Sequence, residues 1–166
     1  MSIRRQILAA IALAFIAAPA MAQPSMVKKF DNWGVYSYKD NGKTVCYVLT
    51  VPQKMAPSDV NHGDNFLLVA PKPGNRHAYA PQAHMGYELK PKSQVTVKVD
   101  DDTFFMTPRG KTAWTQREAR EGEFVNAMKA GSTLTIEATS KRGTETRYGF
   151  SLAGVTAALK QAEKCN

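Results

Sequence analysis

The chain has 166 residues, of which 43% are hydrophobic and 22% are charged, and its formal net charge at pH 7 is +8. These values are ordinary for a globular protein and suit one domain with a single core. The basic residues form no dense stripe, which argues against nucleic acid as a partner.

The first 22 residues have the pattern of a secretory signal peptide. Arg4 and Arg5 precede an uncharged run over residues 7–18, and Ala20-Met21-Ala22 supplies a small-x-small cleavage site. The run is shorter than the roughly 20 residues that span a bilayer. We therefore predict cleavage after Ala22, a mature domain over residues 23–166, and a location in the periplasm, with outer-membrane association or secretion as alternatives.

The mature chain is expected to be released and not tethered. The residue directly after the predicted cleavage site is Gln23 and not a cysteine, so the acceptor of a bacterial lipoprotein is missing, and no later apolar run is long enough to cross a membrane. Removal of Arg4 and Arg5 lowers the net charge to +6. A basic exported protein suits either contact with anionic lipid or polysaccharide or simple solubility.

The first half of the mature chain indicates β-structure. Residues 23–29 read as a leader, and residues 33–39 and 44–51 as a hairpin, because Asn41-Gly42 favours a type I′ turn. Residues 52–64 read as loop. The alternation in the second strand predicts one apolar face, formed by Val45, Tyr47, Leu49 and Val51.

Further strands are predicted downstream. Residues 66–70 form a short apolar strand, and residues 76–86 are ambiguous, with an irregular edge strand as one interpretation. Residues 95–99 and 103–107 predict a hairpin across the aspartates at 100–102.

The last third of the chain changes period. Residues 114–131 indicate a helix that ends at Gly131 in a left-handed cap, and residues 132–140 and 145–151 predict a hairpin. Ser151 is expected to cap a final helix, whose apolar stripe comprises Leu152, Val155, Ala158, Leu159 and Ala162. Together these elements predict an α+β fold, mainly β, as an antiparallel sandwich or partly closed barrel with a late helix and a C-terminal helix.

The two cysteines, Cys46 and Cys165, are expected to form a disulfide. Both remain after signal cleavage, and an even pair in an oxidising compartment favours a bond. Cys165 follows the apolar stripe of the last helix by three residues, and Cys46 lies in the second strand. We predict that the disulfide clips the C-terminal helix onto the N-terminal hairpin.

No motif reaches the pattern of a catalytic or metal site. His62, His77 and His84, with Asp64 nearby, lack the close pairing of a zinc site and are interpreted as loop histidines. The aspartates at 100–102 lack the calcium-loop pattern. Ser151 lacks the second glycine of a nucleophile elbow, and Gly110-Lys111-Thr112 lacks the first glycine of a phosphate loop. We therefore assign no catalytic residue, metal or cofactor, and expect no enzyme.

Two groups of side chains are candidates for binding. Lys141, Arg142 and Arg147 cluster at the last hairpin, where they suit either an acidic glycan or lipid head group or an ordinary solvated turn. Aromatic residues suit either a stacking surface for a ligand or the core, and they are Trp33, Tyr36, Tyr38, Tyr47 and Trp114.

Several of these residues, taken in order, resemble the invasion-associated locus B family of alphaproteobacterial envelope proteins. The resemblance rests on Phe30-Asp31-Asn32-Trp33, Cys46, His62-Gly63-Asp64, Arg142-Gly143-Thr144, and residues 148–154 before an Ala-rich helix. It covers essentially the whole mature chain. It implies an exported, mostly β domain without an established enzymatic activity. Many members have an extra cysteine shortly after the opening Trp, which this chain lacks.

The sequence thus favours an exported, non-catalytic periplasmic or envelope protein, acting in envelope integrity or host-cell interaction. Its partner would be an envelope protein, a lipid or a glycan. The alternative is a periplasmic module that binds a small ligand or a polyanion. Residues 61–86 form the longest segment that the predicted hairpins and helices do not account for, and such segments often carry binding functions.

Overall fold

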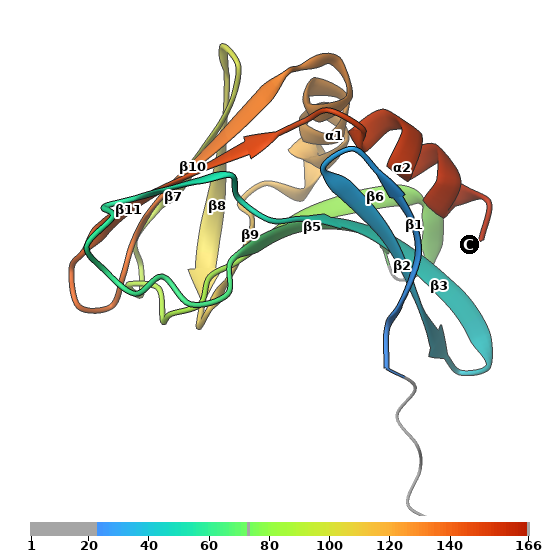
Figure 1. The fold of residues 1–166 in the computed structure, drawn as a ribbon, viewed down its shortest axis with the longest axis horizontal. Helices are drawn as coiled ribbons and strands as arrows, with labels where there is room; N and C mark the ends of the chain where they lie inside the picture. Colours follow the sequence, from blue (N-terminus) through green and yellow to red (C-terminus); the bar gives the residue numbers. More distant parts are fainter. Residues whose placement is uncertain (1–22, 73, 166) are drawn as a thin grey trace, which may run out of the picture.

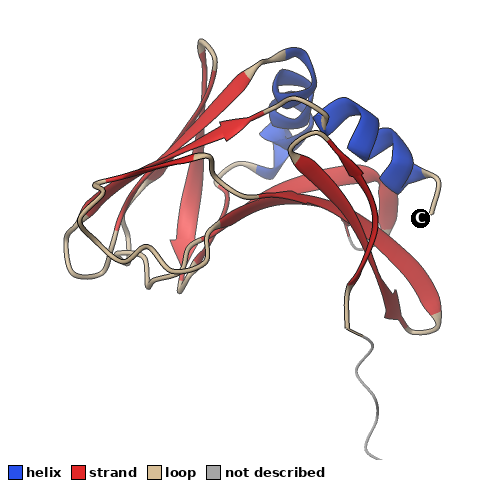
Figure 2. Ribbon diagram, in the orientation of Figure 1, coloured by secondary structure: helices blue, strands red, loops and turns tan. Residues whose placement is uncertain are grey.

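The computed structural model describes residues 23–72 and 74–165, so the predicted signal peptide lies outside the described residues. Within them, eleven strands form a single antiparallel sheet in the order β1-β2-β3-β5-β6-β9-β8-β7-β10-β11-β4. The sheet is strongly twisted and is not closed (Figure 1). Its two edge strands are β1 and β4. The predicted class, mainly antiparallel β with a late helix and a C-terminal helix, is confirmed (Figure 2).

The strands alternate with short turns for most of the chain. Their bounds are β1 Ser25–Phe30, β2 Trp33–Asp40, β3 Lys43–Thr50, β4 Lys54–Ala56, β5 Phe66–Lys72, β6 Asn75–His84, β7 Val95–Val99, β8 Asp102–Arg109, β9 Thr112–Thr115, β10 Thr133–Thr139 and β11 Glu145–Ser151. A 3-10 turn, η1 (Glu118–Arg120), leads into α1 (Glu121–Ala130), and α2 (Val155–Glu163) follows β11. The two helices lie next to each other on one side of the sheet (Figure 1).

The β2–β3 hairpin confirms the predicted turn, but the predicted apolar face of β3 is not its buried face. Asn41 and Gly42 both have positive φ, 49° and 79°, as a type I′ turn requires. The core side of β3 is formed by Cys46, Val48 and Thr50, whereas the alternate residues Val45, Tyr47 and Leu49 are only partly buried and Val51 is 60% exposed. Both faces of this strand are apolar, so alternation alone did not identify the face that α2 covers.

Four other expectations about elements are wrong. The predicted leader contains β1, and the predicted loop at 52–64 contains β4. The predicted irregular edge at 76–86 contains most of β6, which lies inside the sheet between β5 and β9. The predicted helix starts only after β9, because residues 112–115 pair with both β6 and β8.

The predicted helix caps also differ. Gly131 follows α1 in an extended conformation, with φ −83° and ψ 174°, and not in the left-handed one. Ser151 ends β11, and Gly154 is the residue before α2, with a φ of 94°. An added Cβ at Gly154 would lie 2.1 Å from the carbonyl oxygen of Phe30, so a side chain has no room there.

The disulfide joins Cys46 and Cys165, as predicted. The two Cα atoms are 6.0 Å apart, and 119 residues separate the cysteines in sequence. The stripe of α2 is also confirmed, because Val155, Ala158, Leu159 and Ala162 are buried. The C-terminal helix is thus held on β1, β2 and β3 both by apolar contact and by a covalent bond.

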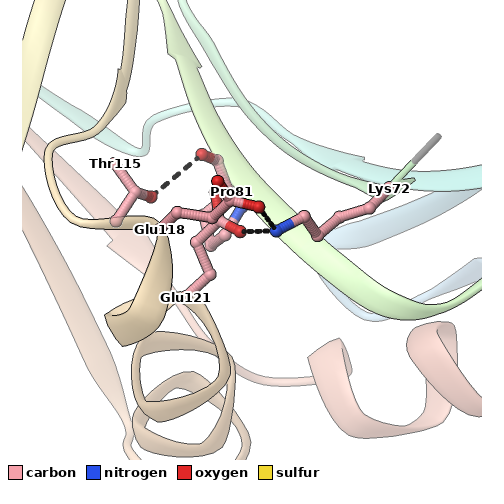
Figure 3. A network of polar contacts seen from close by, with 5 residues as sticks. All are labelled: Lys72, Pro81, Thr115, Glu118 and Glu121. Atoms are coloured by element: carbon pink, nitrogen blue, oxygen red, sulfur yellow. Dashed lines mark hydrogen bonds and ion pairs between the residues drawn. The ribbon is translucent and has the colours of Figure 1, made fainter. Parts of the chain in front are cut away.

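Polar contacts position η1 and α1 against the middle of the sheet (Figure 3). The Lys72 ammonium at the end of β5 pairs with Glu118 of η1 and, at 2.9 Å, with Glu121 of α1. The hydroxyl of Thr115 donates to the carbonyl of Pro81 in β6 at 3.4 Å. The ammonium bonded to Glu118 lowers the pKa of that carboxyl group below its usual value. These contacts connect the entry of α1 to β5 and β6.

Asp100 ties the β7–β8 turn to the start of β10. Its carboxylate accepts hydrogen bonds from the amides of Ser132 and Thr133, at 2.8 and 3.0 Å, and from the Thr133 hydroxyl at 2.9 Å. These donors, the Ser132 amide first, lower the pKa of the Asp100 carboxyl group. A lowered native pKa stabilises the fold above the unfolded-state value, and this stabilisation is lost as the pH falls through the native pKa.

We therefore predict that Asp100→Asn is less stable than wild type at neutral pH and that the difference disappears in acid. Urea unfolding from about pH 6 to about pH 2 measures this change. Asp101→Asn is the matched control, because that side chain is exposed in the same turn. Parallel stability curves for Asp100→Asn and wild type across this range would contradict the assignment.

Candidate functional site

The three basic residues predicted for binding fall into two environments. Arg147 in β11 pairs with its cross-strand neighbour Glu137 at 2.6 Å, and Lys98 of β7 approaches the same carboxylate at 3.8 Å. Lys141 and Arg142 are exposed in the β10–β11 turn. Across residues 23–72 and 74–165, no ion pair involves either of them. Two of the three cations therefore remain available to a ligand.

Lys141 and Arg142 border a recess of about 280 Å³, which we call the His62 recess. Its opposite wall comes from the loop between β4 and β5, and part of its lining comes from the segment after β6. The lining side chains central to the argument are Asn61, His62, Tyr87, Lys141, Arg142 and Thr146. The recess thus joins three segments that are far apart in the sequence.

His62 fixes the loop wall of the recess. The residue is 8% exposed, and its Nε2 lies 2.8 Å from the carbonyl oxygen of Pro57. Because a carbonyl only accepts, Nε2 carries the proton, and Nδ1 accepts the hydroxyl of Tyr148 at 2.8 Å. Both ring nitrogens therefore hold protein groups in place.

The side chain of Asn65 joins the same loop to the segment after β6 by hydrogen bonds. Its amide nitrogen donates to the carbonyls of His62 and Gly63, both at 3.0 Å, and its oxygen accepts the amide of Gly86 at 3.0 Å. An added Cβ at Gly86 would lie 2.3 Å from the His62 carbonyl oxygen. The backbones thus meet at a distance that only glycine allows.

The floor of the recess is neutral and internally hydrogen-bonded. Thr146 donates to the carbonyl of Ala138 at 3.0 Å, so its oxygen accepts the hydroxyl of Tyr87 at 2.6 Å. Burial, and then the nearby Tyr87 hydroxyl, raise the pKa of Tyr148 far above its usual value. Tyr148 therefore remains a neutral phenol at physiological pH and adds no negative charge.

The β10–β11 turn opposite the loop is also held firmly. The amide of Ser140 donates to the Thr144 carbonyl at 2.9 Å, and the amide of Thr144 donates to the Ser140 hydroxyl at 3.0 Å. The amide of Lys141 donates to the carbonyl of Glu88 at 2.7 Å. Both walls of the recess are therefore built before any ligand arrives.

A larger recess of about 480 Å³ is lined by residues of β4, β7, β10 and β11. Its charged lining residues are Glu137, Glu145 and Arg147. Since Arg147 is paired with Glu137, the surface offers no unpaired cation from the predicted trio. This second recess suits an anionic ligand less well than the His62 recess does.

Among the other predicted candidates, the described side chains of His84 and Asp64 form no metal-binding group with His62. The predicted loop position is wrong for His84, which is the last residue of β6. His84 stacks on Phe66 with ring centroids 4.6 Å apart, and Asp64 is exposed. His77 lies in β6, and its side chain is outside the description. In the described part of the chain, no group of three or more His, Cys, Asp or Glu residues could hold a metal ion.

The predicted aromatic group is also divided. Trp33 is fully buried and donates its indole N–H to the Ser151 carbonyl at 3.0 Å. Tyr36 and Tyr47 stack across β2 and β3 with ring centroids 5.7 Å apart, and Tyr38 meets Tyr47 edge-on at 6.1 Å. Trp114 is 40% exposed on β9. The tyrosines form one surface cluster, whereas the two tryptophans lie elsewhere.

Comparison with known protein families shows to which family the chain belongs. The family model described as "Invasion associated locus B (IalB) protein" matches residues 33–163. The chain belongs to this family. The match runs from the first residue of β2 to the last residue of α2, so it includes both walls of the His62 recess.

A solved structure supports the same fold for this IalB-family chain. The crystal structure of invasion associated protein B from Bartonella henselae has a TM-score of 0.63 and 15% identity, covering 83% of this chain and 95% of that one. No curated protein sequence matches the chain. Within the described residues, no helix combines the length and apolar character needed to cross a bilayer.

Sequence reasoning missed Asn65, Gly86, Tyr87 and Tyr148 as parts of the site. The sequence indicated Asn65 and Gly86 only indirectly, because both fall within the segment at 61–86 that was singled out as a candidate for binding. Tyr148 lies in a predicted hairpin strand and was used only for the family resemblance. The contacts that join these residues to His62 are set by strand order and could not be read from spacing.

Proposed function

We propose that this IalB-family protein is an exported, non-catalytic component of the bacterial periplasm or cell envelope. It acts by binding another envelope component. This binding serves either the integrity of the envelope or the contact with a host cell. The observation that carries the proposal is the Cys46–Cys165 disulfide, because such bonds persist in oxidising compartments. The signal-peptide pattern of residues 1–22 supports the same location.

Several side chains of the types that perform acid–base or nucleophilic chemistry are committed to structure here. Both cysteines are in the disulfide, both nitrogens of His62 are bonded to protein groups, and Tyr148 is a neutral buried phenol. The similar structure from Bartonella henselae is that of an invasion associated protein, which favours the host-contact role.

Cell fractionation with mass spectrometry tests the location. Bacteria expressing the whole chain should yield a periplasmic protein that begins at Gln23, with Cys46 and Cys165 oxidised. The control Ala22→Arg places a long charged side chain at the cleavage position and should retain the uncleaved precursor. Recovery of the uncleaved wild-type chain with reduced cysteines in the cytosol would refute the proposal.

A second candidate function is a periplasmic module that binds a small ligand or a polyanion. The His62 recess favours it, because two unpaired cations lie beside preformed walls. Pull-down from periplasm separates the two roles. Enrichment of an envelope protein supports the first role. Loss of the captured material after small anions have been removed from the extract supports the second role.

A further inference from the structure

We infer that the His62 recess binds a phosphomonoester group. This inference rests on the second candidate function and names its ligand class. The recess holds about 280 Å³, just below the roughly 300–1,000 Å³ of pockets that enclose a whole drug-sized ligand. Its size therefore suits a charged head group with a small substituent, while the rest of a larger ligand stays outside.

The charge of the recess favours an anion with about two negative charges. Lys141 and Arg142 both border it, and neither is neutralised by a protein carboxylate. A phosphomonoester carries about −1.5 to −2 at pH 7, whereas a carboxylate carries about −1. Arginine bonds phosphate oxygens in pairs and lysine adds a compact charge, so the two residues suit a phosphate.

One carboxylate, that of Glu88, also belongs to the lining and must be considered. Its Oε2 lies close to Gly110, because an ideal Cβ on that glycine would be 3.8 Å from it. Gly110 is in the β8–β9 turn, and its carbonyl accepts the amide of Leu89 at 3.0 Å. The Glu88 carboxylate thus reaches toward another turn and leaves the two cations unpaired.

The recess also keeps its shape without a ligand. His62 and Asn65 pin one wall, and the Ser140–Thr144 hydrogen bonds pin the other. A preformed site loses little conformational entropy on binding, so most of the charge–charge attraction is available as affinity. The phenol of Tyr148, which is hydrogen-bonded to the His62 ring of the loop wall, is neutral and adds no negative charge.

Calorimetric titration of the protein with glucose 6-phosphate tests the inference, with glucose 6-sulfate as a probe of similar size and a single negative charge. We expect the phosphate to bind more tightly than the sulfate. Arg142→Gln should weaken phosphate binding about tenfold or more, because a charged hydrogen bond is lost. The matched control is Arg147→Gln, which removes the same charge from the same hairpin and should change the affinity less than about twofold.

A vesicle arm distinguishes a soluble phosphate from a lipid. Phosphatidylcholine vesicles with and without phosphatidic acid are sedimented with each variant. Binding that needs phosphatidic acid and Arg142 supports the inference with a lipid source, and binding of glucose 6-phosphate alone supports it with a soluble source. Absence of both interactions, equal affinity for the sulfate, or equal losses in Arg142→Gln and Arg147→Gln would overturn it. A correctly exported protein without phosphate binding refutes this inference and leaves the proposed location standing.

Discussion

Replacement of both cysteines by alanine is expected to lower the free energy of unfolding by roughly 4–5 kcal/mol. The bond closes a loop across a sequence separation of 119 residues, and the chain-entropy model assigns this value to such a closure. For a domain of this size the loss corresponds to a melting temperature lower by on the order of 10–20 °C. Calorimetry or circular dichroism measures the shift.

The double variant Cys46→Ala with Cys165→Ala is preferred to a single change, because a single change leaves a free thiol at the β3–α2 contact. Wild-type protein melted with a reductant should approach the midpoint of the double variant, since both lack the closure. Apolar contacts of α2 remain in both, so helix content should persist at low temperature. A double variant that melts at the same temperature as the oxidised wild type would disprove the stabilising role of the bond.

The sequence was sufficient where local chemistry decides the structure. The Asn41-Gly42 turn, the stripe of α2 and the pairing of Cys46 with Cys165 each depend on neighbouring residues or on the only possible cysteine pair. The buried face of β3 could not be predicted in this way. Tyr47 and Leu49 are as apolar as Cys46 and Val48, and only the docking of α2 decides which set is covered.

The outer face of β2 and β3 explains how apolar residues remain on a surface. Tyr36 folds over Gly34, where an added Cβ would lie 2.6 Å from the ring, and it stacks on Tyr47. The tyrosines shield one another, so the strand has two apolar faces and no clear alternation. A strand with polar residues on its outer face would have shown its buried face by its alternation.

The candidate site could be predicted only in part. Lys141 and Arg142 were identified from their charge in a turn, and this placement holds. Their separation from Arg147 was not predictable, because it depends on the cross-strand pairing of Arg147 with Glu137. The contribution of His62 depends on the loop before β5 lying beside the β10–β11 turn, and no local pattern indicates that arrangement.

Gly86→Ala is expected to have the second largest effect, a loss of about 3 kcal/mol in the free energy of unfolding. The new Cβ would lie 2.3 Å from the His62 carbonyl oxygen, 2.5 Å from the Asp64 amide nitrogen and 2.6 Å from the Gly63 carbonyl carbon. All three are backbone atoms, so no side-chain rotation relieves the contact. The loop must move instead, and this places the cost at the upper end of the range for overpacking.

The same movement of the loop should also distort the His62 recess. This local distortion distinguishes Gly86→Ala from a variant that only has a lower free energy of unfolding. Displacement of the loop pulls His62 from Tyr148 and Asn65 from the Gly86 amide. Amide chemical shifts of residues 58–65 should therefore change at temperatures where the protein is folded. The control Gly122→Ala has open space around its Cβ within α1 and should stabilise the protein by about 0.5–1 kcal/mol. Unfolding by urea measures both variants, and a Gly86→Ala protein as stable as wild type would show that the loop does not rest on this glycine.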